Sequence, residues 1–272
     1  MSVPLLSVKR FAARGCELNF AEGPDAGPPL VLVHGITSWW QSFLPVMHGL
    51  ILSHHVFAID MRGHGGSGRA SSYLVTDYAA DIVDFISAKA PVGASIIGHS
   101  MGAHAALAAA GRIKLKGLVL EDAPLTVQAG RIVPQGPQKV FGDWQRLKRE
   151  NSDFDSMLTA VKAAKLEVSP LAARVRAKTL MLMDGAALGE YGVGDPFIGY
   201  DPQALIEELD CPVLALRADE TIFARLDVAA ADAIAQTARD GYALRIAGAG
   251  HNIHGEAPDR WFGAVAAFLH TL

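Results

Sequence analysis

Serine, histidine and carboxylate side chains in this sequence stand where apolar runs end. Ser100 lies in "GHSMG", between the apolar run "ASIIGHS" and the alanine-rich run "MGAHAALAAAGR". A hydroxyl on such a strand-to-helix turn can act as a nucleophile if a base accepts its proton and a third group orients that base. His251, in "GAGHNIH", can be the base. These residue types indicate nucleophilic catalysis, although a serine here could instead simply cap the following helix.

The elements that must position these residues read as strands alternating with helices. The strand candidates are "LVLVHG", "HVFAIDMRG", "ASIIGHS", "GLVLEDAP", "PVLALRA" and "YALRIAGAG". Their nearly continuous apolar character is typical of parallel strands that helices cover on both faces. The crossover helices are expected over 75–90, 101–112, 227–238 and 258–272. The first two runs, "VKRFAA" and "CELNFAEG", predict an antiparallel hairpin at one edge of the sheet.

Polar residues follow these strands, and in an open parallel sheet ligand sites form at the carboxyl ends of the strands. The residues concerned are His34, Asp60, Ser100, Glu121, Asp122, Asp219, Glu220 and His251. We therefore expect a serine, a histidine and several carboxylates to converge on one edge of the sheet.

At this point the sequence resembles the α/β-hydrolase superfamily over nearly its whole length. Gly98, Ser100 and Gly102 match its G-x-S-x-G motif, and "HG", "DMRGHGGSG" and "GAGHNIH" occur in the family's order. The resemblance implies an α/β fold, with a mostly parallel central sheet flanked by helices and a helical lid inserted after the sixth strand. It also implies a Ser-Asp-His triad. The backbone N–H groups of Ile36 and Met101 would form the oxyanion hole.

The carboxylate that orients His251 has two candidates. Members of the family commonly carry the acid after the strand that follows the lid, but the expected register there falls on Thr221 and not on Asp219. Some branches carry it at the end of the preceding strand, where Asp122 stands. Glu121 should point the opposite way, because successive side chains of an extended chain alternate. We predict Asp122 as the acid, with Asp219 as the alternative.

The rhythm of strands breaks between 123 and 209, which predicts the helical lid as an insertion into a core formed by 1–122 and 210–272. The pocket wall is expected to include Trp39, Trp40, Phe141 and Trp144. The segment "HGITSWWQSF" resembles a branch of the family whose members hydrolyse 2-(acetamidomethylene)succinate. The lid of this chain differs from that branch, so the substrate stays open.

Composition limits the other functions. The 272 residues are 50% hydrophobic and 19% charged, with a formal net charge of -4, which argues against binding to nucleic acid. Cys16 and Cys211 are too far apart in sequence to suggest a disulfide framework or a zinc knuckle. His251 and His254 form an H-x-x-H that nothing nearby completes, so no metal is expected. No signal peptide or membrane-spanning run is evident, so we expect a cytoplasmic monomer or homodimer with a small-molecule substrate.

The sequence thus predicts a serine hydrolase, carboxylesterase-like or amidase-like, that needs no cofactor. It would cleave a small, partly apolar ester, amide or related acyl bond, a C–C bond included, through an acyl-enzyme on Ser100. Two alternatives stay open. One is a cofactor-independent dioxygenase that uses His251 and Asp122 as its base pair. The other is a non-catalytic ligand receptor built on the same scaffold.

Overall fold

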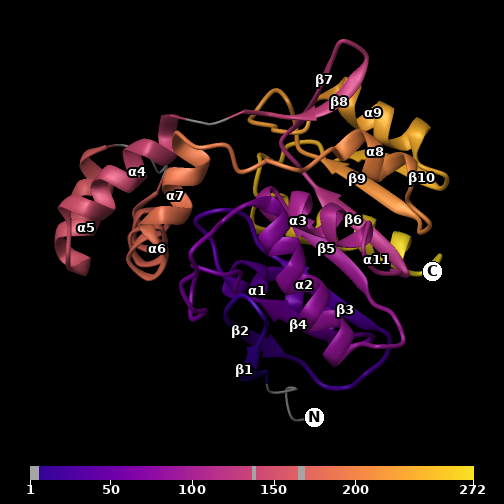
Figure 1. Cartoon of the computed structure of the whole chain (residues 1–272), viewed down its shortest axis with the longest axis horizontal. Helices are drawn as coiled ribbons and strands as arrows, with labels where there is room; N and C mark the ends of the chain where they lie inside the picture. Colours follow the sequence, from indigo (N-terminus) through magenta and orange to yellow (C-terminus); the bar gives the residue numbers. More distant parts are fainter. Residues whose placement is uncertain (1–5, 137–138, 165–168) are drawn as a thin grey trace.

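An eight-stranded sheet forms the centre of the protein in the computed structural model, which describes residues 6–136, 139–164 and 169–272 (Figure 1). The strand order is β1-β2-β4-β3-β5-β6-β9-β10. The strands are β1 (Ser7–Ala12), β2 (Glu17–Glu22), β3 (Pro29–Val33), β4 (His55–Ile59), β5 (Ser95–His99), β6 (Gly117–Glu121), β9 (Val213–Arg217) and β10 (Gly241–Arg245). Strand β2 pairs antiparallel with β1 and β4, and the remaining pairs are parallel. This confirms the mostly parallel sheet and the antiparallel edge hairpin.

Helices cover both faces of the sheet, which explains why β5 and β6 are buried at every residue. One core cluster packs under α2, α3, α8 and α9, and the other packs under α1, α10 and α11. The helices are α1 (Leu44–Leu50), α2 (Val75–Lys89), α3 (Met101–Ala110), α8 (Pro202–Glu207), α9 (Val228–Thr237), α10 (Ile253–Glu256) and α11 (Pro258–Leu269). The four helices predicted as crossovers are confirmed as α2, α3, α9 and α11.

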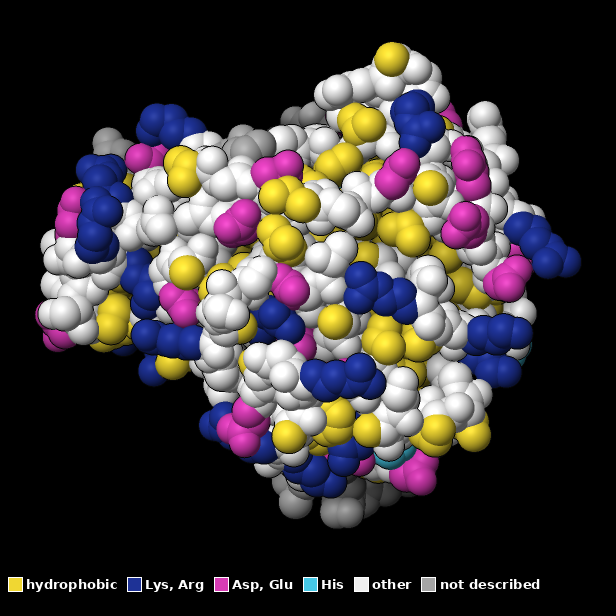
Figure 2. Space-filling model, viewed as in Figure 1, with side chains coloured by type: hydrophobic (Ala, Val, Ile, Leu, Met, Phe, Trp, Pro, Cys, Tyr) yellow, Lys and Arg dark blue, Asp and Glu magenta, His cyan; other side chains and the backbone are white. Residues whose placement is uncertain are grey.

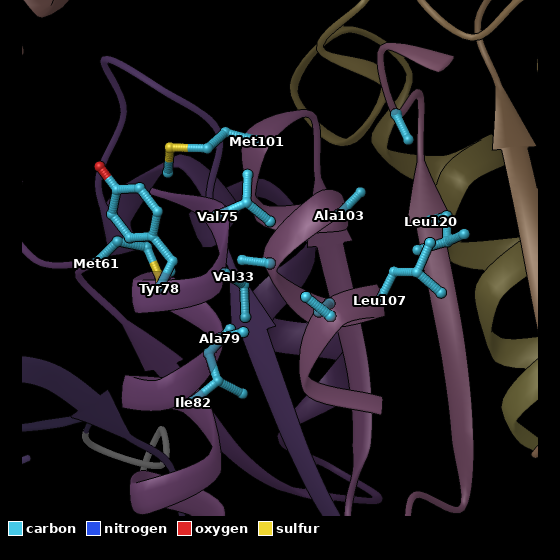
Figure 3. Packing of buried hydrophobic residues seen from close by; sticks show 14 of the residues in the cluster. Val33, Met61, Val75, Tyr78, Ala79, Ile82, Met101, Ala103, Leu107 and Leu120 are labelled. Atoms are coloured by element: carbon cyan, nitrogen blue, oxygen red, sulfur yellow. The ribbon is translucent and has the colours of Figure 1, made fainter. Parts of the chain in front are cut away.

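The first core cluster shows how the sheet holds α3 beneath the site. Figure 3 shows Val33 and Leu120 from the sheet beside Leu107 of α3 and Ile82 of α2, and all four side chains are fully buried. Most other residues of α3 are alanine, so this helix packs closely against both its neighbour and the strands. Burying a leucine side chain stabilises the folded state by about 1.5–3 kcal/mol. The start of α3 is therefore a rigid base for Ser100.

The chain between β6 and β9 begins with an antiparallel hairpin that the sequence analysis did not anticipate. Strands β7 (Leu125–Gln128) and β8 (Arg131–Pro134) are joined by Ala129 and Gly130, which have φ of 48° and 75°. Two positive φ values define the tight turn that twists with its strands, and asparagine or aspartate is usual at the first position. Because alanine stands at this position, the sequence alone did not indicate a turn.

Four helices follow the hairpin and lie apart from the sheet, at the left of Figure 1. They are α4 (Lys139–Glu150), α5 (Phe154–Ala163), α6 (Pro170–Leu182) and α7 (Gly185–Gly192). Helix α8, the last before β9, contacts α3 and β8. We call α4 to α7 the helical insert.

The surface carries charges of both signs. Figure 2 shows lysine and arginine interspersed with aspartate and glutamate over the face in view. In the ranges that the structure describes, none of the helices combines the length and the apolar character needed to cross a bilayer.

Among the buried histidines, four have a pKa that burial lowers. The pKa falls to about 4 for His34 and to about 3 for His64, His99 and His104. The hydrogen bonds of His34 show why a second proton on its ring is unfavourable. Its Nδ1–H donates to the Gly35 carbonyl at 2.8 Å, and its Nε2 accepts the Met61 N–H at 3.0 Å. A proton on Nε2 would break the second bond and bury a charge.

We expect these histidines to make the fold sensitive to acid. Their folded pKa values lie below the ordinary value of 6.5, so between the two values the unfolded chain binds more protons. The contribution is therefore complete above pH 6.5 and is lost as pH falls towards 4 for His34 and towards 3 for the other three, at about 1.4 kcal/mol per pH unit for each histidine. Urea unfolding at pH 7, 6 and 5 measures the slope. His64→Gln should reduce it by about one proton, whereas His270→Gln, on an exposed side chain, should not, and equal slopes would contradict the assignment.

Candidate active site

Ser100 occupies a strained turn between β5 and α3. Its φ of 54° and ψ of -116° lie in a region that side chains rarely adopt. The turn is possible because glycines flank it. A Cβ at Gly98 would come within 2.4 Å of the Gly102 carbonyl oxygen, and a Cβ at Gly102 within 2.3 Å of the Val33 oxygen. The Ser100 side chain makes no capping hydrogen bond to α3, so the hydroxyl is available for another partner.

That partner is His251, which follows β10. Its Nε2 lies 3.0 Å from Ser100 Oγ, and its Nδ1 lies 2.7 Å from Asp122 Oδ2. In this order the Ser100 hydroxyl donates to Nε2, and Nδ1–H donates to the carboxylate. The structure thus joins residues 100, 122 and 251 in one chain of hydrogen bonds, with the geometry of a nucleophile, a base and an orienting acid.

Asp122 is held by backbone as well as by His251. It is fully buried and has a φ of 43°. Its Oδ1 accepts the N–H of Ala218 at 3.1 Å and that of Leu226 at 3.2 Å, and its Oδ2 accepts the N–H of Arg225 at 2.8 Å. These donors compensate for the loss of water around a buried carboxylate. They also fix its direction, so that His251 meets an oxygen in a defined place.

The alternative acid, Asp219, has a different set of contacts. Its Oδ2 accepts the Gly248 N–H, while its Oδ1 accepts from Thr221 and from the Arg245 guanidinium at 2.8 Å. The Gly248 N–H bond, followed by those from Thr221, holds the pKa of this carboxyl well below its usual range. Asp219 therefore fastens the turn that precedes His251 and is not its hydrogen-bond partner.

The two residues predicted to form the oxyanion hole lie beside Ser100, in the wall of one pocket. Met101 begins α3, so its N–H has no acceptor within the helix. Ile36 follows Gly35, where a Cβ would lie 2.9 Å from His99 Nδ1 and 3.1 Å from Ser100 Cβ. Glycine thus allows the loop that carries Ile36 to approach the nucleophile closely.

The pocket beside Ser100 is mostly apolar and draws its walls from both the core and the helical insert. Its cavity volume is about 20 Å³, which holds about one water molecule. Its apolar walls are formed by Met101, Pro124, Phe141, Tyr191, Pro196 and Phe197. The apolar walls beside the Ser100 hydroxyl have the character of a site for a small, partly apolar ligand.

Of the four aromatic residues predicted to line the pocket, the structure places Phe141 in its wall. Trp144 packs behind Phe141, with ring centroids 5.5 Å apart. Trp40 is buried in the core cluster that packs under α1, α10 and α11. Trp39 is half-buried and immediately precedes the 3-10 helix η1 (Trp40–Phe43). Tyr191 also lies in the pocket wall. It was not predicted, because nothing in the sequence of α7 indicates which of its residues face the site.

Comparison with known proteins places these features in context. A family model described as "Alpha/beta hydrolase family" matches residues 30–264. The 2-(acetamidomethylene)succinate hydrolase of Mesorhizobium japonicum is 38% identical over 96 residues, which are 35% of this chain and 34% of that protein. The N-formylmaleamate deformylase of Pseudomonas putida is 34% identical over 127 residues, or 45% of this chain and 47% of that protein. The matches thus span about a third to a half of these relatives.

Solved structures resemble the fold over a greater length. The crystal structure of E-2-(acetamidomethylene)succinate hydrolase matches with a TM-score of 0.77 and 22% identity, covering 98% of this chain and 100% of that one. The esterase RhEst1 from Rhodococcus matches with a TM-score of 0.75 and 22% identity, covering 98% and 99% of the two chains. At this level of identity the likeness shows the shared fold.

Proposed function

The chain belongs to the alpha/beta hydrolase family, and from this premise we propose that it is a serine hydrolase acting on a small, partly apolar ester, amide or related acyl compound. One observation carries the proposal: Ser100, His251 and Asp122 form a continuous hydrogen-bonded chain beside an apolar pocket. The relatives named 2-(acetamidomethylene)succinate hydrolase and N-formylmaleamate deformylase, and the structural neighbour named as an esterase, support a hydrolytic reaction.

The first half of the reaction acylates Ser100. As Oγ forms a bond to the carbonyl carbon of the substrate, its proton passes to His251 Nε2 and the carbonyl π electrons move onto oxygen. The Asp122 carboxylate stabilises the imidazolium that results. When the tetrahedral intermediate collapses, the leaving group departs with the proton from Nε2, and Ser100 is left as an ester of the acyl group.

The second half releases the acyl group. A water molecule gives a proton to His251 Nε2 while its oxygen attacks the same carbon. Collapse of this second intermediate breaks the bond to Ser100 Oγ, which takes the proton back, and the carboxylic acid leaves. In both halves the N–H groups of Ile36 and Met101 would hold the negative oxygen, and each such donor is worth about 3 kcal/mol of barrier.

We propose that the insertion, residues 123–209, serves as a lid over Ser100. Phe141 from α4 and Tyr191 from α7 form part of the pocket wall. Arg176 from α6 stacks over the Trp144 ring at 4.4 Å and donates to the Thr37 carbonyl at 3.3 Å. Thr37 follows Ile36 directly, so the lid contacts the same loop that carries the oxyanion donor.

Labelling of the nucleophile tests the proposed function. A fluorophosphonate should lose fluoride and phosphonylate Ser100 Oγ, and peptide mapping by mass spectrometry would locate the modified residue. The wild-type protein should also hydrolyse short p-nitrophenyl esters. Heat-denatured protein is the control, because reaction at Ser100 needs the folded site. Absence of both labelling and turnover would reject the proposal.

Shortening Phe141 should change the acyl preference of the enzyme. Its ring forms one wall of the pocket, so Phe141→Ala would enlarge the space and remove contacts to short acyl groups. We expect the ratio of kcat/KM for hexanoate over acetate esters to rise about tenfold, which is within the range for a few methylenes in an apolar pocket. Trp39→Phe, outside this wall, is the control. A ratio that moves equally in both variants would contradict the assignment.

A further inference from the structure

Glu121 immediately precedes Asp122, and its carboxylate points away from the triad into a second, completely buried site. One oxygen accepts the His254 N–H at 3.0 Å and lies 2.9 Å from His254 Nδ1. The other lies 3.0 Å from the same Nδ1 and accepts the Trp261 Nε1–H at 2.9 Å. Glu121, His254 and Trp261 are all 0% exposed. Two consecutive carboxylates at the end of β6 thus hold the two histidines of the H-x-x-H, one each.

The segment between the two histidines is held at a third point. His99 Nε2–H donates to the His251 carbonyl at 2.9 Å. The His99 ring stands between the other two, with centroids 4.7 Å from His251 and 5.1 Å from His254. The Phe43 ring stacks on the His254 ring, with centroids 4.5 Å apart. The backbone and both ends of this segment therefore have fixed partners.

A buried carboxylate is costly unless donors surround it. Burial by itself raises the pKa of Glu121, but the charge and hydrogen bonds of His254 outweigh it and hold the pKa at about 2. The carboxylate is therefore ionised at neutral pH. Apolar side chains of similar volume would fill the same space and often stabilise a fold equally well. A buried carboxylate–imidazole pair therefore needs a reason beyond stability, and its geometry supplies one, because the hydrogen bonds from Glu121 fix where His254 lies.

We propose that Glu121 and His254 form a second carboxylate–imidazole pair that positions His251 against Ser100. The inference rests on the serine hydrolase proposed above and adds two positioning residues to it. Asp122 orients the His251 ring, while Glu121 holds the helical turn of α10 that follows the ring. A catalytic base displaced by about 1 Å can cost on the order of 100-fold in rate. The pair should therefore affect kcat and not the binding of substrate.

The primary test compares Glu121→Gln and His254→Gln with a matched control. Asp81 is also a buried carboxylate in an ion pair, with Arg62 Nε 2.7 Å and Nη2 2.8 Å away, but it lies on α2. Asp81→Asn should lower thermal stability while leaving kcat per folded molecule unchanged. The two variants of the pair should lower kcat for a p-nitrophenyl ester, and the rate of fluorophosphonate labelling, on the order of 100-fold, with KM within about twofold.

Proton NMR provides a readout that needs no activity. His251 Nδ1–H and His254 Nδ1–H should give two strongly downfield signals, and His254→Gln identifies its own by removing it. Glu121→Gln should remove the His254 signal and shift or broaden the His251 signal, whereas Asp81→Asn should leave both in place. An unchanged His251 signal together with an unchanged kcat in Glu121→Gln would overturn the proposal.

Two further results separate the possible failures. If the single variants do not fold, the double variant Glu121→Met with His254→Phe replaces both partners by apolar groups of similar shape. A purely structural pair would then give normal kcat, which would overturn the proposal, whereas a positioning pair gives a folded protein with low kcat. If wild-type Ser100 is not labelled at all, the proposed function fails, and the His251 signal still decides whether Glu121 positions the ring.

Discussion

Ser100→Ala is expected to abolish ester hydrolysis, with kcat falling by about a millionfold, towards the rate that binding and the oxyanion donors sustain alone. The variant removes the atom that would carry the acyl group. The fold should persist, because the turn at Ser100 is made by the flanking glycines and the hydroxyl caps nothing in α3. Initial rates with p-nitrophenyl acetate and probe labelling measure the effect.

Ser95→Ala is the matched control, since Ser95 is also buried and begins the same strand, β5, at the far end from the site. Its kcat should stay within about twofold of the wild-type value, because Ser95 lies away from the reacting groups and shares no partner with them among the residues that the structure describes. The same pair of variants discriminates the dioxygenase. Oxygen consumption with an aromatic substrate that survives Ser100→Ala would favour that alternative, because there the base pair His251 and Asp122 does the chemistry.

Asp122→Asn is expected to lower kcat by about 10⁴-fold while keeping the fold. The amide can still accept from backbone through its oxygen, so the N–H groups of Ala218 and Leu226 need not lose their partner. With the amide oxygen in the place of Oδ1, the amide NH2 group takes the place of Oδ2 and faces His251 Nδ1. This group can only donate a hydrogen bond to Nδ1, which favours the wrong tautomer of the base. Steady-state kinetics and circular dichroism of the variant measure the two parts of this expectation.

Asp219→Asn serves as the comparison for the choice of acid. Its carboxylate binds Gly248, Thr221 and Arg245, so its loss should loosen the turn before His251 and lower kcat only a few-fold. The reverse ranking of the two variants would show that the carboxylate after β9 is the one that supports catalysis.

The sequence predicted the sheet and its crossover helices well, because strands buried on both faces leave continuous apolar runs and the segments between these runs are long enough to cross over as helices. Asp122 was preferred to Asp219 because the expected register after the lid falls on Thr221, and alternation along the chain put Glu121 and Asp122 on opposite sides of one strand end. The structure shows each of them with a different histidine. This part of the prediction depended on the alternation of neighbouring side chains, which can be inferred from sequence.

What the sequence could not supply depends on contacts between distant segments. Glu121 and His254 are 133 residues apart, and the H-x-x-H was interpreted only for metal ligands that it lacks. Tyr191 reaches the pocket because α7 folds back beside α4, and no periodicity reports that. The β7–β8 hairpin was missed because Ala129 stands where a turn residue is usual.

The paired carboxylates at the end of β6 also limit how this chain can change in length. Deleting or inserting one residue within β6 would turn Glu121 towards His251 and carry Asp122 away from it, since alternate side chains of a strand face opposite sides. The turn at Ala129 and Gly130 carries no residue of the triad, and a Cβ at Gly130 would meet nothing within 4 Å. Related chains should therefore vary in length at that turn and keep β6 at one length, even where most of its side chains are exchanged.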